Sequence, residues 1–183
     1  MVRSVPPGRL GRVLIARQEV ASRVTELGLA IRRDYAGRFP VFVGVLKGAL
    51  VFAADLFRAA DLPSNLDFMG VSSYGGDARP SGIVRLTADL SMSIEGRDVI
   101  LVEDIIDTGR TLAYLRRNLA TRHPRSLAFC VLLDKVARRE VEVAVDYVGF
   151  AIPDEFVVGY GLDLAGYYRG LPYVAALERG ETG

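Results

Sequence analysis

Runs of apolar residues alternate along the chain with stretches whose apolar residues recur at helical spacing. Three runs are typical of strands buried on both faces of a parallel sheet: Val41–Leu46, 99–102 and 127–133. Three other stretches have helical spacing: 17–35, 49–60 and the segment marked by Leu112, Leu115 and Leu119. Because strands that alternate with helices build layered domains, we predict an α/β fold with three layers, in which helices flank a mainly parallel central sheet.

Two further segments extend this pattern. Residues 66–68 begin a strand that leads into 72–82, a stretch rich in Gly, Ser and charge, and 83–86 are typical of the returning strand. The stretch between these strands predicts a long mobile loop. Residues 143–150 predict one more strand of the same sheet.

The composition is that of one globular domain. Half of the 183 residues are hydrophobic and a quarter are charged. From Ala151 onwards the alternation breaks into pieces rich in Gly, Pro and Tyr. We therefore expect a single domain over residues 1–183, with a small hood contributed mainly by about 151–175.

Charge and apolar runs limit where the protein acts. The net charge of +1 argues against a nucleic-acid partner. The apolar runs are too short to span a bilayer, and residues 1–11 carry prolines and glycines where a signal peptide would be apolar. We expect a cytoplasmic protein without a membrane partner. Cys130 lies in the apolar run 127–133, so we expect a buried thiol.

The segment 99–112 carries the clearest chemistry. A buried strand ends in Glu103 and Asp104, and the turn Asp107-Thr108-Gly109-Arg110-Thr111 then opens a helix. Ligands of open α/β sheets bind beyond the carboxyl ends of the strands. Backbone N–H groups and the two threonine hydroxyls at a helix N-terminus form a site for a phosphate. The segment has neither the Walker A pattern nor the glycine fingerprint of a dinucleotide-binding or Rossmann-like nucleotide-binding loop.

The acidic residues allow two interpretations. Glu103 and Asp104 at a strand end can accept hydrogen bonds from vicinal sugar hydroxyls, or hold Mg²⁺ through water. Alternatively, the acids compensate the helix N-terminus, with Asp107 as its N-cap. This alternative accounts for Asp107 and leaves Glu103 and Asp104 without a role.

The same string resembles the phosphoribosyl-diphosphate-binding motif of type I phosphoribosyltransferases, in the version found in the hypoxanthine-guanine branch. The resemblance covers about 41–169 and includes four further segments in the family's order. These segments are Leu46-Lys47-Gly48 of the pyrophosphate loop, Ser73-Tyr74 of the mobile catalytic loop, Asp134-Lys135 for purine recognition, and Phe156-Val157 through Asp163 to Arg169 for base stacking and pyrophosphate contact. Lys47 and Lys135 are the only lysines among 23 basic residues.

The resemblance implies an enzyme of purine salvage. Such an enzyme transfers the 5-phosphoribosyl group of phosphoribosyl diphosphate to N9 of a 6-oxopurine, hypoxanthine or guanine, and releases pyrophosphate and the nucleoside monophosphate. The residues implied to bind phosphoribosyl diphosphate are Lys47, Gly48, Glu103, Asp104, Asp107, Thr108, Gly109, Arg110, Thr111 and Arg169. Mg²⁺ is the implied cofactor, with Asp163 as the main protein ligand beside Glu103 and Asp104. The peptide bond before Lys47 is predicted to be cis.

Four residues are implied to handle the purine. Asp107 is the candidate general base at N7. Lys135 donates to the 6-oxo group and disfavours adenine, because its ammonium would face the 6-amino group donor to donor. Phe156 stacks on the base and Val157 contributes backbone groups. The competing interpretations are a helix cap for Asp107, an exposed loop lysine for Lys135 and core packing for Phe156.

Other functions remain open on the sequence alone. One is a phosphoribosyltransferase for xanthine or a pyrimidine, and another is a regulator that senses phosphoribosyl diphosphate or nucleotides without turnover. The presence of Lys47, Asp107, Asp163 and Arg169 together favours an enzyme. The resemblance also implies a homodimer or homotetramer, with the helix after Gly48 near the interface.

Overall fold

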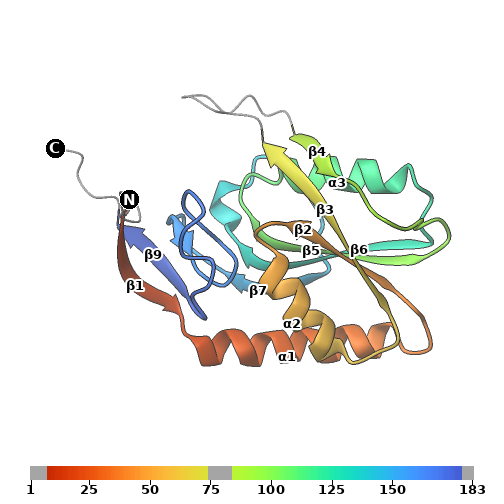
Figure 1. Ribbon diagram of the computed structural model, residues 1–183, viewed down its shortest axis with the longest axis horizontal. Helices are drawn as coiled ribbons and strands as arrows, with labels where there is room; N and C mark the ends of the chain where they lie inside the picture. The colour runs from red at the N-terminus through yellow and green to blue at the C-terminus, as the bar shows by residue number, and fades with distance from the viewer. Residues whose placement is uncertain (1–7, 74–83, 179–183) are drawn as a thin grey trace, which may run out of the picture.

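The computed structural model describes residues 8–73 and 84–178, which form a six-stranded central sheet and a smaller sheet beside it (Figure 1). The central sheet has the order β4 (Val84–Ala88), β3 (Asn65–Ser73), β2 (Val41–Leu46), β5 (Asp98–Ile106), β6 (Ser126–Asp134) and β7 (Tyr147–Ala151). Neighbouring strands are parallel, except that β4 runs antiparallel to β3. This confirms the mainly parallel sheet.

Helices cover both faces of the central sheet. Figure 1 shows α1 (Arg17–Asp34) and α2 (Leu50–Ala60) on one side and α3 (Arg110–Ala120) on the other. The side chains of β2 explain why both faces are covered: Phe42 packs with the residues of α1 and α2, whereas Val43 packs with those of α3. A strand that is apolar on both faces needs a layer on each. The predicted three-layer α/β fold is confirmed.

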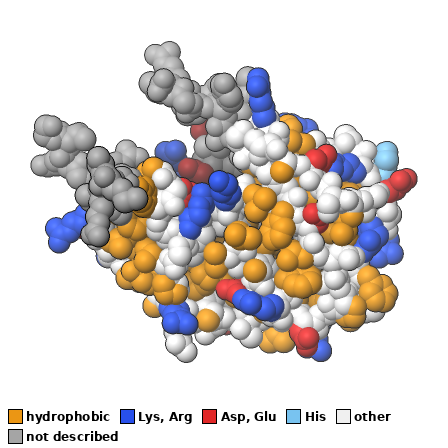
Figure 2. All heavy atoms as spheres, viewed as in Figure 1, with side chains coloured by type: hydrophobic (Ala, Val, Ile, Leu, Met, Phe, Trp, Pro, Cys, Tyr) orange, Lys and Arg blue, Asp and Glu red, His pale blue; other side chains and the backbone are white. Residues whose placement is uncertain are grey.

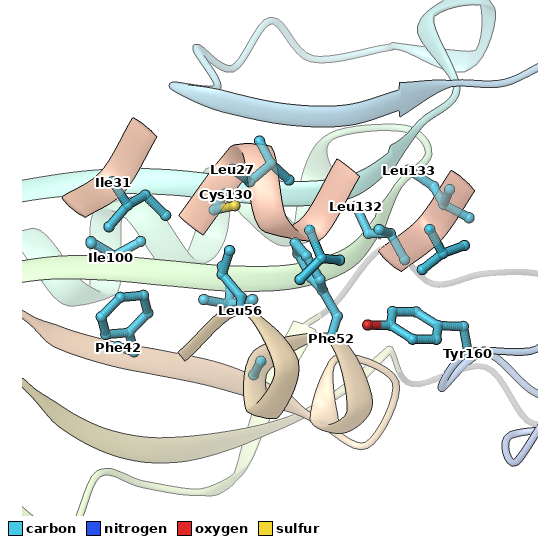
Figure 3. Close-up of a cluster of buried hydrophobic side chains, with 14 of the residues drawn as sticks. Leu27, Ile31, Phe42, Phe52, Leu56, Ile100, Cys130, Leu132, Leu133 and Tyr160 are labelled. Carbon is cyan, nitrogen blue, oxygen red and sulfur yellow. The ribbon is translucent and has the colours of Figure 1, made fainter. Parts of the chain in front are cut away.

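The larger of the two apolar clusters joins α1, α2 and the central sheet (Figure 3). Phe52 and Leu56 of α2 are fully buried there, and the ring of Phe42 meets Phe57 edge to face with centroids 5.5 Å apart. Cys130 is buried in the same cluster, and this burial raises the pKa of its thiol. The predicted buried thiol is confirmed.

The small sheet joins the two ends of the described chain. Its antiparallel order is β1 (Arg9–Ile15), β9 (Val174–Glu178) and β8 (Val157–Val158), and none of these strands was expected from the sequence. Tyr160 connects the segment after β8 to the central core: Figure 3 shows its ring beside Phe52. Its hydroxyl donates to Oδ2 of Asp55 on α2 at 2.6 Å. The single-domain organisation and the limits of the hood at about 151–175 stay predictions.

Two predicted strand limits differ from the structure by four residues. β5 continues through Glu103 and Asp104 to Ile106, so the acids lie within the strand and do not follow it. β7 begins at Tyr147, four residues later than predicted. The carbonyls of Val143 and Ala144 accept hydrogen bonds from arginine side chains, so apolar character there serves packing without a strand. In the described ranges, no helix is long and apolar enough to cross a membrane.

Candidate active site

Three neighbouring parallel strands bring the predicted motifs to one edge of the central sheet. β2 ends at Leu46 and is followed by Lys47 and Gly48, β5 ends one residue before Asp107, and β6 ends one residue before Lys135. Ile106 pairs with Asp134 in the register of β5 and β6. Parallel strands that share a register carry their C-terminal loops to the same place, so segments far apart in the chain meet here.

The turn between β5 and α3 requires glycine at its centre. Gly109 has φ +84° and is the N-cap of α3. A Cβ atom there would also lie 2.5 Å from the carbonyl oxygen of Val141. The carbonyl of Thr108 accepts hydrogen bonds from the N–H groups of Glu140 and Val141, both at 3.0 Å. The interpretation of Asp107 as the N-cap is therefore wrong, because the helix begins three residues later.

The two acids of β5 lie beside a cavity of about 260 Å³, which we call the turn cavity. Its lining includes Glu103, Asp104 and Asp107 with Thr108, Gly109 and Thr111. Burial and the neighbouring Asp104 raise the pKa of Glu103 well above its usual range, and burial also raises that of Asp104. Within the described residues, Oε2 of Glu103 has no hydrogen-bond partner. A buried acceptor without a partner suits a ligand that brings hydroxyl groups.

The loop after β2 touches both β5 and the segment after β8. The peptide bond between Leu46 and Lys47 is cis, as predicted. A Cβ atom at Gly48 would overlap Oδ2 of Asp104, far inside the 3.0 Å that real Cβ atoms keep. A Cβ atom at Gly161 would overlap the carbonyl oxygen of Gly48 in the same way. Gly161 was not predicted to belong to the site, although the Gly159-Tyr160-Gly161 pattern is a signal for close backbone approach.

Asp163 and Arg169 reach the same loop through Gly161. Nη2 of Arg169 lies 2.6 Å from Oδ1 of Asp163, and Nη1 donates to the carbonyl of Gly161 at 2.6 Å. Oδ2 of Asp163 accepts the N–H of Gly166 at 2.6 Å. The side chain of Lys47 is exposed and makes no hydrogen bond or ion pair with the described residues. The cations Lys47 and Arg169 thus lie in and beside the loop that follows β2.

Among the residues that the structure describes, no three His, Cys, Asp or Glu side chains are grouped closely enough to hold a metal ion by themselves. Glu103, Asp104 and Asp163 nevertheless offer the oxygen ligands that Mg²⁺ prefers. Mg²⁺ commonly takes one or two carboxylates together with substrate phosphates and water. These residues therefore fit a metal that arrives with a phosphorylated substrate.

A second cavity of about 540 Å³, here called the Lys135 cavity, lies on the other side of Asp107. Its lining is Asp107, Lys135, Arg138, Asp154, Glu155, Phe156 and Leu177. Lys135 is 7% exposed, so its interpretation as an exposed loop lysine is wrong. Phe156 is 38% exposed and lines the cavity, so it is not a core residue. Val157, the next residue in the chain, is buried in β8.

Charged side chains in the Lys135 cavity form a row in which positive and negative groups alternate. Nζ of Lys135 lies 3.7 Å from Oδ1 of Asp154, and Nη1 of Arg138 lies 3.6 Å from Oδ2. Nε of Arg138 donates to Oδ1 of Asp107 at 3.0 Å. This hydrogen bond raises the pKa of Arg138. Arg138 and Asp154 were missed from the sequence, because no local pattern shows that they line the same cavity as Asp107.

The remaining predicted residues are less fully placed. Arg110 begins α3 and forms an ion pair of 2.6 Å with Glu140. Ser73 is the last residue of β3. Tyr74 and the rest of the predicted catalytic loop, 74–82, lie outside the described residues.

Comparison with known proteins identifies the family. The phosphoribosyl transferase domain family matches residues 14–164. The chain is 47% identical to the hypoxanthine-guanine phosphoribosyltransferase of Mycobacterium avium, over 94% of this chain and 88% of that protein. A crystal structure of a hypoxanthine-guanine phosphoribosyltransferase from Bacillus anthracis superimposes with a TM-score of 0.87 at 46% identity, covering 92% of this chain and 99% of the other. The chain therefore belongs to the phosphoribosyltransferase family, and it has the type I fold.

The relatives differ in length. The chain is also 50% identical over 91% of its length to the bifunctional protein TilS/HprT of Listeria monocytogenes, of which it spans only 26%.

Proposed function

We propose that this protein transfers the 5-phosphoribosyl group of phosphoribosyl diphosphate to N9 of hypoxanthine or guanine, and so serves purine salvage. The observation that carries the proposal is the position of Asp107, which lines both the turn cavity and the Lys135 cavity. A sugar phosphate in the first and a purine in the second would meet at this carboxylate. The names of the relatives support the same reaction.

The turn cavity is suited to the phosphoribosyl group. Backbone N–H groups at the start of α3 and the hydroxyls of Thr108 and Thr111 would bind the 5-phosphate. Glu103 and Asp104 would accept hydrogen bonds from the ribose hydroxyls. Arg110, which opens the helix, belongs to the same proposed contact set. Each of these groups lines or adjoins one cavity, so one ligand can engage them together.

Pyrophosphate would leave towards the loop after β2. Lys47, the backbone of Gly48 and Arg169 offer the positive charge and N–H donors that phosphate oxygens require. Mg²⁺, when bound, neutralises charge that develops on the leaving group. Asp163, Glu103 and Asp104 are the residues we propose to hold it, together with substrate oxygens. Positive groups that face the leaving oxygen before the bond breaks lower the barrier.

The Lys135 cavity is suited to a 6-oxopurine. Lys135 would donate to O6, and Asp107 would accept the proton that leaves N7 as the new bond forms at N9. Phe156 would stack on the ring, and Val157 would contribute backbone groups to the base edge. Adenine would be disfavoured, because its 6-amino group would face the ammonium of Lys135 donor to donor.

We also propose a homodimer or homotetramer in the cytoplasm. Figure 2 shows hydrophobic side chains gathered in the middle of the face that carries α2 in Figure 1. Leu50, the first residue of α2, is 48% exposed. Light scattering after size-exclusion chromatography tests this part, and a mass near that of the 19.9 kDa monomer would contradict it.

The test of the reaction is turnover with defined substrates. The protein is incubated with phosphoribosyl diphosphate, Mg²⁺ and each of hypoxanthine, guanine, xanthine, adenine and uracil, and nucleotide formation is followed. We expect turnover with hypoxanthine or guanine, and a loss of roughly 10²–10⁴ in rate in Asp107→Asn. Asp61→Asn, which changes an exposed aspartate at the C-terminal end of α2, is the control.

Three other results would change the conclusion. Turnover only with xanthine would keep the 6-oxopurine class and change the base. Turnover only with adenine or uracil would overturn the roles of Lys135 and Phe156. Binding of phosphoribosyl diphosphate without any turnover would favour a sensing protein.

A further inference from the structure

Arg138 belongs to none of the motifs, yet its guanidinium spans the Lys135 cavity between two carboxylates. Nε donates to Oδ1 of Asp107 at 3.0 Å, and Nη1 lies 3.6 Å from Oδ2 of Asp154. Asp154 in turn lies 3.7 Å from Lys135. The proposed base and the proposed purine lysine are thus the two ends of one chain of opposite charges.

The backbone holds Arg138 in this place. The N–H of Lys135 donates to the carbonyl of Ile106 at 3.0 Å, which fastens the loop after β6 to the residue before Asp107. The short helical turn Val136–Arg138 follows, and the N–H of Arg138 donates to the carbonyl of Lys135 at 2.9 Å. This turn folds Arg138 back over the end of β5. The fold therefore places the backbone of Arg138 within side-chain reach of Asp107.

The contact is too exposed to serve mainly for stability. The side chains of Arg138, Asp107 and Asp154 are 48%, 42% and 49% exposed. Exposed ion pairs contribute only about 0–1 kcal/mol. The contact instead selects one oxygen: Nε of Arg138 donates to Oδ1 of Asp107, and Oδ2 is left to receive a proton.

Asp154 gives the guanidinium a second partner. When Asp107 takes the proton from N7 of the purine, the N–H bond breaks, its electron pair stays in the ring system, and the carboxylate loses its charge. Arg138 then still faces Asp154. The positive charge of Arg138 therefore keeps one negatively charged partner after Asp107 has been neutralised.

We propose that Arg138 is a positioning residue that orients Asp107 for proton abstraction, with Asp154 holding the guanidinium from the other side. This inference rests on the proposed phosphoribosyl transfer. It assigns the orientation of the general base, Asp107, to a residue outside the motifs that resemble those of phosphoribosyltransferases.

The experiment compares Arg138→Gln and Arg138→Lys in the unsubstituted protein and in Asp107→Asn. We expect Arg138→Gln to lower kcat about tenfold, a part of the ~10²–10⁴ that a positioned base contributes. The KM for phosphoribosyl diphosphate should stay within about twofold, because the turn cavity is untouched. Lysine should not restore kcat, since its ammonium is a point charge without the planar fork of arginine.

The decisive comparison is the double variant. If Arg138 acts through Asp107, Arg138→Gln should cost less than about twofold in the Asp107→Asn background. Arg32→Gln removes an arginine of similar exposure from an ion pair with Asp61, and it should leave kcat unchanged. Thermal melting checks that each variant is folded.

Several outcomes would overturn the inference. These are an equal loss in both backgrounds, full recovery with lysine, a change confined to KM, or an equal fall in Arg32→Gln. Turnover that Arg138→Gln leaves unchanged overturns this inference alone. No turnover by the unsubstituted protein would remove the proposed function, and this inference with it.

Discussion

The two cavities that meet at Asp107 are built in different ways. The turn cavity is lined by nearly consecutive residues of one strand, turn and helix, and Val71 is the one distant wall among the residues that the structure describes. The Lys135 cavity collects residues from the ends of β5 and β6, the segment before β8, and β9 of the small sheet. The first therefore depends on backbone geometry within one segment, and the second on how two sheets dock.

This difference predicts different kinds of sensitivity. Around the turn cavity, Gly109 lies against the backbone of Val141 and Gly48 against the side chain of Asp104, so closely that neither position has space for a side chain. Around the Lys135 cavity, side-chain charges at 3.0–3.7 Å connect separate segments, and they can be altered singly without a clash. We therefore expect substitutions around the turn cavity either to preserve activity or to remove most of it. Substitutions around the Lys135 cavity should lower activity by degrees.

The largest effect is expected for Gly48→Ala. Its Cβ atom would overlap Oδ2 of Asp104, so the carboxylate or the loop after β2 must move by an ångström or more. Misplacement on that scale costs about 10²-fold in rate. Steady-state kinetics should show this loss, while calorimetry should show that binding of the free purine base in the Lys135 cavity is less affected.

Gly170→Ala is the matched control for this substitution. Gly170 has no atom within 4 Å of its Cβ position, so an alanine there meets open space. Its activity should stay within about twofold of the unsubstituted protein. If the two alanine variants lose activity equally, the loss in Gly48→Ala does not come from the close approach of Gly48 to Asp104.

A smaller and graded loss is expected for Lys135→Gln. Hydrogen bonds from charged groups contribute about 1.5–3 kcal/mol, which corresponds to roughly 10–100-fold in kcat/KM for hypoxanthine. The amide of glutamine can also accept, so the ratio of adenine to hypoxanthine turnover should rise. Unchanged discrimination between these two bases would contradict the proposed contact with O6.

The turn side was largely predictable from the sequence, because its chemistry lies in consecutive residues. The limits of β2 agree residue for residue with the apolar run Val41–Leu46. Leu112, Leu115 and Leu119 are all buried in α3, as their spacing predicted. Each of these elements shows its own hydrophobic periodicity, so a local pattern is sufficient to predict where it lies and which face it buries.

The Lys135 side was predictable only in part. Asp107, Lys135 and Phe156 were found through their resemblance to a family, whereas Arg138, Asp154 and Leu177 were not found. β1 and β9 pair residues that are 159 to 169 positions apart, from Ile15 with Val174 to Arg9 with Glu178, and β8 has only two residues. No local periodicity marks such strands, because their pairing is decided by tertiary packing.

Acid should weaken the strand that serves both cavities. Asp98 begins β5 at the end opposite Asp107, is 1% exposed and accepts hydrogen bonds from Arg125 and from Ser126. Mainly through Arg125, its pKa falls from 3.8 to about 2. Because the folded pKa is the lower one, this carboxylate stabilises the fold fully above pH 4, and its contribution disappears as the pH falls through 2.

Urea unfolding across this range checks the effect. Between pH 5 and pH 2 the contribution of Asp98 should fall by up to about 2 kcal/mol, less where the exposed Arg125 is screened by salt. In Asp98→Asn this part of the pH dependence should be missing, so the free energies of unfolding of the two proteins converge at low pH. Parallel curves would show that another carboxylate is responsible.

The smallest effect, and the sharpest test of sheet docking, is expected for Tyr160→Phe. Tyr160 joins the segment after β8 to α2 through its hydrogen bond to Asp55, and Tyr147 makes a comparable bond of 2.9 Å to Asp34 between β7 and α1. Removing either hydroxyl should lower the free energy of unfolding by about 1 kcal/mol. Only Tyr160→Phe loosens the segment that leads back to Phe156, so only this variant should raise the KM for hypoxanthine, by about two- to fivefold, with the KM for phosphoribosyl diphosphate less changed. Equal purine KM values in the two phenylalanine variants would mean that the Lys135 cavity keeps its shape without this bond, and that the small sheet is docked by apolar packing alone.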